Sequence, residues 1–369
     1  MDTILIDTQH DCTPKGGGQR RTSQISYLAR AAGFEAIHLP LERSGEHRGR
    51  VVSGLGFAAQ SRFPLQFSLR AVRSCGLAVQ AYRRALSQHR GTKILLRERT
   101  GGVGKVAARI ASEFGFKSVA VPQNIESLVP EQTDEVALPR AGWGALRNEV
   151  NHFRLDAATF CISREEQWFL NVNGIDAGCL PYFPIPDWEA ELLGLRQIRR
   201  PALPRRFLIL GSAANPPVRR GIVELANLAG PIAAKLGCHI DVAGNDTQEL
   251  KIDPCSGAVT NHGTVSAEHL SSLLMETTAA IVLQRAGCGA LTKLPEFLIA
   301  GIPVIANANA LRSAYHYRGV HEFESNEELE ALMQADLPVP PPPDRPRMHE
   351  TRFIDQMRRL AGDCSRAAS

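Results

Sequence analysis

The sequence predicts an α/β fold built from two doubly wound parallel sheets. Short apolar runs alternate along the chain with segments of helical period, which is the order of successive βα units. Most of the runs are apolar throughout instead of alternating, as expected for parallel strands covered by helices on both faces. A proline-rich stretch near the middle of the 369 residues separates two groups of runs. A chain of this length exceeds one ordinary core, so we expect two domains.

The predicted strands are the apolar runs themselves. They cover residues 4–7, 36–39, 93–98, 118–122 and 158–163 in the first group, and residues 207–212, 239–244, 279–284 and 302–307 in the second. Between them, SQISYLARAAGF (23–34) and RRGIVELANLAGPIAAKLG (219–237) carry a helical period. Strands and helices thus alternate in both halves, which favours a doubly wound sheet in each.

Proline tracts set the predicted domain boundaries. Four prolines surround the basic run RQIRR in the middle of the chain, a composition typical of linkers. The tract PVPPPPDRPR precedes a last helical stretch. We therefore expect an N-terminal domain of residues 1–185, a linker of residues 186–204, a C-terminal domain of residues 205–345, and a C-terminal helix and tail of residues 346–369.

The composition excludes several classes of protein. Hydrophobic residues make up 44% and charged residues 22%, and the net charge of +4 is too small to indicate a nucleic-acid partner. No apolar run reaches the roughly 18–20 residues of a membrane span. The opening MDTILIDTQHD carries acids where a secretory signal is basic. The eight cysteines are scattered without a CxxC pair, which suggests reduced thiols and a cytoplasmic location.

Glycine-rich loops follow two strands of the first half. RTGGVGKVAA (99–108) is not a phosphate-binding P-loop, because Arg99 stands where the first glycine belongs and Val106 replaces the hydroxyl that holds magnesium. We interpret it as a turn that opens a helix. In PKGGGQRRTSQ, three glycines (Gly16, Gly17 and Gly18) precede a helix, where the backbone can approach an anion. A flexible turn is the alternative.

A third loop follows the first strand of the second half. The strand ends at Gly211, and Arg219 and Arg220 lie near the start of the next helix, ILGSAANPPVRRGIVEL. Cations at a helix N-terminus oppose its dipole. A bound phosphate would offset that conflict, whereas simple solvation of both arginines is the alternative interpretation.

The stretch QRAGCGALTKLPEFLIAGIPVIAN carries the strongest candidate site. Gly287 and Gly289 make a loop whose N–H groups can converge on an anion. A helix is expected to follow, with its proline in the first turn and a terminating Gly-x-Pro. Lys293 and Glu296 share one face of that helix. They are either ligands or a solvent-facing ion pair worth under about 1 kcal/mol.

This stretch resembles the nucleotide-sugar motif of glycosyltransferase family 4, which comprises retaining enzymes of the GT-B fold. The matching residues are Thr292, Lys293, Glu296, Ala300, Gly301, Pro303 and Val304. Other segments are similar to family segments in the same order, namely VPQNIE (121–126), SREEQWFLNVNGID (163–176) and HGTVSAEHLSSLL (262–274). The resemblance implies two Rossmann-like domains facing a central cleft, with the C-terminal helix returning toward the N-terminal domain.

The resemblance also implies an activity. A sugar would pass from a nucleoside diphosphate sugar to a glycan or lipid-linked acceptor with retention of anomeric configuration, in polysaccharide biosynthesis, and without metal or other cofactor. Arg219, Arg220 and Lys293 would stabilise the charge on the leaving diphosphate. Glu296 would hold the ribose. The other donor-binding residues would be Gly16, Gly17, Gly18, Gly211, Gly263, Gly287, Cys288, Gly289, Ala290, Leu291 and Thr292.

Two positions depart from the family pattern. The pattern has two glutamates eight positions apart, but Cys288 stands eight positions before Glu296, and Gln123 replaces an expected histidine on the acceptor side. Two alternatives therefore stay open. One is a non-catalytic GT-B relative that binds a sugar nucleotide or acts as a partner subunit, and the other is a GT-B sugar-nucleotide epimerase. A dinucleotide oxidoreductase is disfavoured, because no GxGxxG with a downstream acid is present.

A basic amphipathic region bears on the acceptor. Residues 61–91 carry Arg62, Arg70, Arg73, Arg83, Arg84 and Arg90 among apolar residues. Such a helix can lie on anionic lipid, which would suit a lipid-linked acceptor and a peripheral position at the inner face of the plasma membrane. The alternative is an ordinary surface helix with a solvated face.

Overall fold

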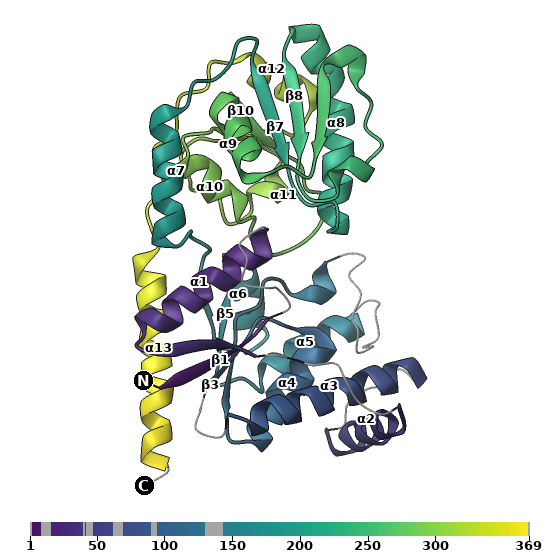
Figure 1. Cartoon of the computed structure of the whole chain (residues 1–369), viewed down its shortest axis with the longest axis vertical. Coiled ribbons are helices and arrows are strands. Elements are labelled where there is room, and N and C mark those ends of the chain that lie inside the picture. Colours follow the sequence, from purple (N-terminus) through teal and green to yellow (C-terminus); the bar gives the residue numbers. More distant parts are fainter. Residues whose placement is uncertain are drawn as a thin grey trace. The chain divides into compact units, whose positions relative to one another are not determined.

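The computed structural model describes residues 2–8, 16–39, 41, 47–61, 69–89, 94–129 and 143–367. The chain forms two compact units, one comprising Met1–Tyr182 with Pro346–Ser369 and the other Phe183–Arg345. Each unit contains one six-stranded parallel sheet with helices packed against it (Figure 1). The prediction of two doubly wound, Rossmann-like domains is confirmed.

The first sheet has the strand order β2-β1-β3-β4-β5-β6. Its strands are β1 (Thr3–Asp7), β2 (Glu35–His38), β3 (Ile94–Arg97), β4 (Lys117–Ala120), β5 (Ala158–Cys161) and β6 (Ala177–Cys179). All pairs are parallel, and the register places Asp7 beside Arg97. Residues Thr8 and Glu98, which follow β1 and β3, therefore lie at the same carboxyl edge. Our prediction omitted β6, because its three residues AGC contain no β-branched or aromatic side chain.

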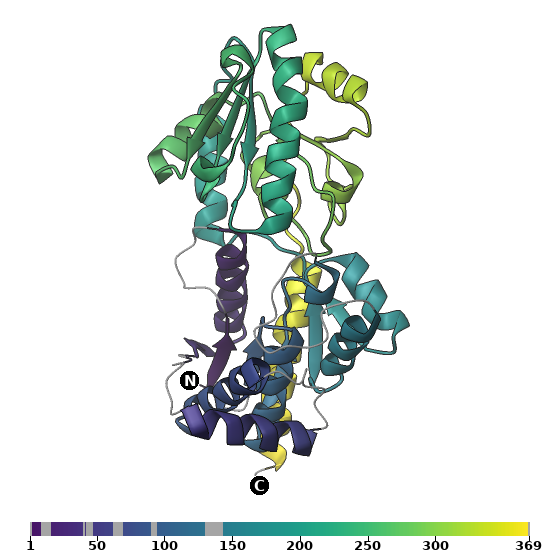
Figure 2. The ribbon, with the colours of Figure 1, turned by 90° about the vertical axis from the view of Figure 1, so that its right-hand side faces the viewer.

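Helices cover both faces of this sheet. They are α1 (Gly17–Ala31), α2 (His47–Ser61), α3 (Leu69–Ser87), α4 (Gly101–Glu113), α5 (Trp143–Phe153), α6 (Arg164–Val172) and α13 (Arg347–Ala367), with a 3-10 turn at Glu126–Leu128. Helices α2 and α3 pack very closely (Figure 2), since a Cβ added at Gly76 would lie 1.7 Å from the Arg50 carbonyl oxygen. Phe353 of α13 contacts Phe160 of β5 edge-on at 5.1 Å between ring centroids. The last helix thus returns to the N-terminal domain, as predicted.

The second sheet has the strand order β12-β11-β10-β7-β8-β9, again parallel throughout. Its strands are β7 (Arg206–Leu210), β8 (His239–Ala243), β9 (Val259–Gly263), β10 (Ala279–Val282), β11 (Val304–Ala306) and β12 (Val320–Glu322). Our prediction missed the two edge strands, β9 and β12. Both carry polar residues (VTNHG and VHE), so neither gives the continuous apolar signal of a strand buried on both faces.

The helices of the second unit form two apolar layers around this sheet. They are α7 (Pro186–Ile198), α8 (Pro216–Leu236), α9 (Ala267–Glu276), α10 (Lys293–Ile299), α11 (Ala308–Leu311) and α12 (Asn326–Gln334), with 3-10 turns at Thr247–Glu249 and Cys255–Gly257. Helix α8 packs Ile222 and Leu225 against Ile209 on one face. On the other face, Phe297 and Leu298 of α10 pack against Leu208 of β7.

The predicted linker of residues 186–204 needs correction. Residues 186–198 form helix α7, which packs on α10 within the second unit. The Arg196 guanidinium donates to the Leu298 carbonyl oxygen at 3.1 Å, at the end of α10. The prolines indicate a linker by composition, but Pro186 lies in the first turn of α7, where its missing N–H has no helical partner to lose.

Candidate functional site

Helix α10 places Lys293 at the carboxyl edge of the second sheet. The helix begins at Lys293 with its proline in the first turn, as predicted. It ends in a Schellman arrangement: Gly301 has φ of +75°, and the Ile302 N–H donates to the Phe297 carbonyl at 2.8 Å. The Lys293 ammonium donates to the carbonyl oxygen of Leu210, the last residue of β7, at 2.6 Å. Lys293 therefore binds the strand end and does not form the solvent-facing ion pair with Glu296.

The environment of the Lys293 ammonium is largely apolar. A narrow cavity beside it is lined by Ile209, Ile222, Leu283 and Leu291, together with other residues of β7, α8 and β10. Burial lowers the pKa of Lys293 to about 8. The ammonium is thus a poorly hydrated cation held at a strand end, and an anionic ligand would stabilise its charged form.

The Gly-Cys-Gly loop before α10 is held by a residue that the sequence reasoning missed. The Arg312 Nε donates to the carbonyl oxygens of Cys288 at 2.7 Å and Gly289 at 2.5 Å. Both of its terminal nitrogens lie 3.3 Å from the Gln284 Oε1. Gly287 has φ of +113°, and a Cβ there would lie 2.9 Å from the Gln284 side-chain nitrogen. No local pattern links Arg312 to a loop more than twenty residues earlier.

Arg312 also sets the direction of the loop amides. The carbonyl of Cys288 and the N–H of Gly289 belong to one trans peptide unit and point in opposite directions, and the same holds for Gly289 and Ala290. Because both carbonyls converge on the Arg312 guanidinium, both N–H groups point away from it. A glycine loop held in this way can present backbone N–H groups to an anion such as a phosphate.

Three consecutive strand ends carry glycines that approach one another. Gly211, Gly244 and Gly263 follow or end the neighbouring strands β7, β8 and β9. A Cβ on Gly244 would lie 1.9 Å from the Gly211 carbonyl oxygen, and its N–H donates to the Gly263 carbonyl at 3.0 Å. The structure thus brings together the two predicted glycines and adds Gly244, which the sequence reasoning did not single out.

The predicted arginines of α8 are exposed. Helix α8 begins at Pro216, so Arg219 and Arg220 lie at the end of its first turn, and both side chains face solvent. Arg219 lies 3.8 Å from Glu249 in an exposed ion pair. Their predicted contact with a diphosphate stays a prediction. Glu296 lies in the first turn of α10, three residues after Lys293 and partly buried.

In the first unit, Gly16 is the N-cap of α1, and Gly17 and Gly18 form its first turn without a side-chain cap. The Gly18 carbonyl accepts from Thr22 at 3.2 Å and from Gln123 at 3.3 Å. The role of these glycines in donor binding stays a prediction. Beneath this turn lies Glu98, a buried carboxylate that the sequence reasoning missed.

A buried ion pair lies on the other face of the first sheet. Arg97 and Asp156 form a bidentate contact, and both side chains are fully buried. Ser118 donates to Asp156 at 2.5 Å, and the Arg97 guanidinium lies 5.4 Å from the Phe153 ring centroid. All of its groups are satisfied by the protein itself, so we assign it to stability.

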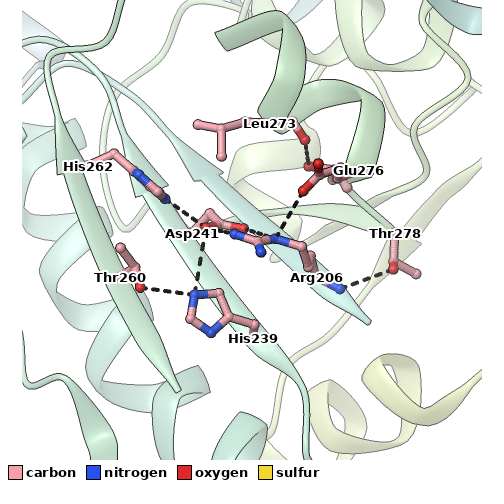
Figure 3. A network of polar contacts seen from close by, with 9 residues as sticks. Arg206, His239, Asp241, Thr260, His262, Leu273, Glu276 and Thr278 are labelled. Carbon is pink, nitrogen blue, oxygen red and sulfur yellow. Dashed lines mark hydrogen bonds and ion pairs between the residues drawn. The ribbon is translucent and has the colours of Figure 1, made fainter. Parts of the chain in front are cut away.

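Figure 3 shows a third polar network, in the second unit. Arg206 binds Asp241 through two nitrogens at 2.8 and 2.5 Å, and His262 Nε2 lies 2.7 Å from Asp241. His239 bridges Asp241 and Thr260 at 3.7 and 3.0 Å. Arg206 and His239 are the first residues of β7 and β8. The network therefore lies toward the amino ends of the strands, whereas ligands of such sheets bind beyond the carboxyl ends.

A cavity of about 710 Å³ opens at the edge of the first sheet, lined by Asp156, Asp176, Arg352, Arg359 and neighbouring residues of β5, β6 and α13. It is the larger of the two cavities described, but it too includes the amino ends of its strands, Ala158 and Ala177. Strand polarity therefore favours the region around Lys293 over this cavity as the binding site.

The basic region exposes both charge and apolar surface. Arg70, Arg73, Arg83 and Arg84 of α3 are exposed, while Arg62 and Arg90 lie outside the described residues. Val52 and Leu55 of α2 and Leu69 of α3 are more than half exposed. Within the described ranges, no helix is both long and apolar enough to cross a bilayer. The same ranges contain no cluster of three or more His, Cys, Asp or Glu side chains arranged to hold a metal ion.

Comparison with known proteins shows the fold. No family model and no curated protein matches the sequence. The UDP-forming α,α-trehalose-phosphate synthase of Burkholderia xenovorans is similar with a TM-score of 0.61 at 11% identity, over 98% of this chain and 96% of that one. The catalytic domain of Arabidopsis thaliana starch synthase IV, bound to ADP and acarbose, has a TM-score of 0.57 at 11% identity, over 96% of this chain and 94% of that one. The UDP-GlcNAc 2-epimerase of Methanocaldococcus jannaschii has a TM-score of 0.52 at 11% identity, over 97% of this chain and 99% of that one. The chain therefore has the GT-B fold.

Proposed function

We propose that this protein is a glycosyltransferase that uses a nucleoside diphosphate sugar as donor. The observation that carries the proposal is the joint placement of the Lys293 ammonium and the Arg312-held loop amides at the carboxyl edge of the second sheet. A desolvated cation and a glycine loop with its amides turned away from Arg312 together suit the diphosphate that departs during sugar transfer. We further propose membership of glycosyltransferase family 4, retention of configuration and independence from metals.

Each group has a distinct role in this proposal. Lys293 and backbone amides of the 287–290 loop stabilise the developing negative charge of the leaving diphosphate. Glu296 accepts hydrogen bonds from the ribose hydroxyls and sets donor affinity. Arg219 and Arg220 contribute a wider positive field from α8. Gly211 and Gly263 lie at neighbouring strand ends of the same carboxyl edge, where the donor would approach the backbone.

The acceptor is a glycan or a lipid-linked sugar in this proposal. The neighbouring helices α2 and α3 expose the apolar residues Val52, Leu55 and Leu69 as well as Arg70 and Arg73. These support a lipid surface, because apolar contact and attraction to anionic lipid act together. That contact would place the protein at the inner face of the membrane.

A thermal-shift screen of UDP, ADP, GDP and their sugars tests the proposed function directly. Stabilisation by one nucleoside diphosphate over its monophosphate is expected, because Lys293 and the loop amides address the diphosphate. Product analysis then separates the classes. A new glycosidic bond supports transfer, an isomerised free sugar supports the epimerase, and binding without turnover over an acceptor panel supports the non-catalytic relative.

Replacing Glu296 with alanine is expected to weaken donor binding by about 1–3 kcal/mol, the range for lost hydrogen bonds to a charged group. Isothermal titration calorimetry with the best nucleoside diphosphate from the screen measures this change. Glu327→Ala, an exposed glutamate in the first turn of α12, is the control and should bind as the wild type does. Equal affinities in the two variants would show that Glu296 does not contact the ribose.

Replacing Arg312 with lysine is expected to weaken nucleoside diphosphate binding by about 1–2 kcal/mol, since a lysine cannot bridge the Cys288 and Gly289 carbonyls as the guanidinium does. Hydrogen exchange in residues 286–291 should quicken in the same variant. The control is Arg285→Lys, an exposed arginine paired with Glu224 just before the loop. If exchange quickens while affinity is unchanged, the loop amides do not hold the diphosphate.

A further inference from the structure

A buried polar cluster lies at the carboxyl edge of the first sheet. We call Thr8, Arg21, Thr22, Glu98 and Gln123 the Glu98 cluster. Thr8 follows β1, Glu98 follows β3, Gln123 lies three residues after β4, and Arg21 and Thr22 belong to α1. Successive side chains of a strand point to opposite faces, so Glu98 faces α1 whereas Arg97 faces the pair with Asp156. The cluster is therefore separate from that ion pair.

Only one oxygen of Glu98 is satisfied. Its Oε2 accepts from Thr8 at 2.6 Å, from Thr22 at 2.8 Å and from Gln123 at 3.3 Å. Its Oε1 is buried and has no hydrogen-bond partner. Glu98 is only 4% exposed, so bulk water does not replace that partner. Leaving a buried acceptor of this kind unpaired is unfavourable and uncommon in native proteins.

The guanidinium of Arg21 is in the same condition. It is fully buried, and its Nη1 donates to the Gln24 Oε1 at 2.5 Å. Its Nε and Nη2 have no hydrogen-bond partner. Glu98 is the strongest charge that Arg21 senses, yet the two form no direct ion pair. The cluster thus holds an unfilled acceptor and two unfilled donors.

The unfilled groups define the chemistry of a ligand. A phosphate or carboxylate would pair with Arg21 but be repelled by Glu98, and a cation would be repelled by Arg21. A hydroxyl group both donates and accepts, so it can satisfy either group. We propose that the Glu98 cluster binds hydroxyl groups of a neutral sugar or polyol, with Glu98 Oε1 accepting from a hydroxyl and Arg21 donating to one.

This site deepens the proposed function and rests on it, because the sugar bound here would be the acceptor. Glu98 and Arg21 are then positioning and specificity-determining residues for the acceptor. The partly buried Gln123 is the side chain that a ligand would displace to reach Glu98 and Arg21. Both of its bonds, to Gly18 and to Glu98, are long at 3.3 Å, so a ligand hydroxyl can displace it at small cost.

The ionisation of Glu98 gives the site a signature. Burial raises the pKa of Glu98 to about 7, against the opposing effects of Thr8, Thr22 and Arg21. Arg21 from α1 is the charged group facing the carboxylate. Cys179 of β6, Cys161 of β5 and Glu166 of α6 also act on Arg21, while Arg97 and its partners occupy the other face of the sheet. The carboxylate accepts a hydroxyl hydrogen bond best when ionised, so sugar binding should strengthen as pH rises through about 7.

The test measures binding of a panel of methyl glycosides and glycerol to the full chain by ligand-observed NMR between pH 5.5 and 8.5. The wild type is expected to bind at least one glycoside, with affinity rising through pH 7. In Glu98→Gln, affinity at pH 8 should fall about 10- to 100-fold and the pH dependence should disappear. The control is Glu113→Gln, a carboxylate exposed on α4 and paired with Arg83.

Binding of UDP and ADP separates this inference from the proposed function. Glu98→Gln should leave nucleotide affinity unchanged. If the wild type binds no nucleotide, the proposed function fails whatever the glycosides do. If no glycoside binds the wild type, or binding is pH-independent, or Glu98→Gln binds glycosides as the wild type does, the sugar site is wrong. The pH profile of the wild type tests the sugar site even if the variant does not fold.

Discussion

Replacing Asp156 with asparagine is expected to lower the free energy of unfolding of the first unit by about 3–5 kcal/mol, the range for breaking one partner of a buried ion pair. The carboxylate accepts from Arg97 and from Ser118, and the side chains of Asp156 and Arg97 are both fully buried. An amide keeps the shape but leaves the Arg97 charge uncompensated in the interior. A loss of this size approaches the whole stability of an ordinary domain.

The two units need not unfold together, so the measurement must report on the first one. Urea titration followed by hydrogen exchange of peptides from β3 and β4 gives the local free energy of opening. The control is Glu113→Gln, which breaks an exposed ion pair with Arg83 and should cost less than about 1 kcal/mol.

A double variant separates charge burial from packing. Arg97→Met combined with Asp156→Asn removes the uncompensated charge and should recover a large part of the lost stability. If the double variant is less stable than Asp156→Asn alone, the guanidinium contributes mainly through its contacts with the Arg99 carbonyl and the Phe153 ring.

The sequence predicted those parts of the fold whose signals are local. Buried central strands, and the helix that begins at Lys293 and ends before Gly301, are recognisable from adjacent residues. The edge strands β6, β9 and β12 were missed because an edge strand needs neither length nor a continuous apolar run. Helix α7 is harder to predict, because a proline indicates a linker and the first turn of a helix equally well.

The residues of the candidate site also differ in whether a local sequence pattern reveals them. Lys293, Glu296 and the glycine loop lie within ten residues of one another, so spacing alone associated them. Arg312 reaches the loop from beyond β11, and Glu98 meets Thr8 and Thr22 from β3. Contacts between residues so distant along the chain depend on strand order, which no local pattern encodes. A long polar side chain directly after a predicted buried strand, as at Glu98, is the one signal that could have been used.

Replacing Lys293 with methionine is expected to lower turnover about 10²- to 10³-fold, the range for losing one group that stabilises charge in a transition state. Methionine fills a similar volume but carries no charge for the leaving diphosphate. The matched control is Lys235→Met, an exposed lysine paired with Glu330.

The pH dependence of the wild type gives an independent check of Lys293. Because burial lowers its pKa to about 8, the ammonium is present below that pH and lost above it. The value of kcat/KM, which reports the free enzyme, should therefore fall as pH rises through about 8. In Lys293→Arg the descending limb should move above the accessible range, since a guanidinium stays protonated.

As pH rises, the contribution of Lys293 to folding stability should increase while its contribution to activity decreases. This difference distinguishes a functional lysine from a structural one. The lysine pKa is about 8 in the folded chain against an ordinary value of 10.5, so the unfolded chain binds more protons between these values and folding stability rises with pH there. Lys293→Met carries no buried charge, so its melting temperature at pH 7 should match or exceed that of the wild type. If Lys293→Met loses turnover and also melts well below the wild type, the hydrogen bond from the ammonium to Leu210 stabilises the fold. The role of Lys293 would then be structural, and its assignment to the diphosphate would be wrong.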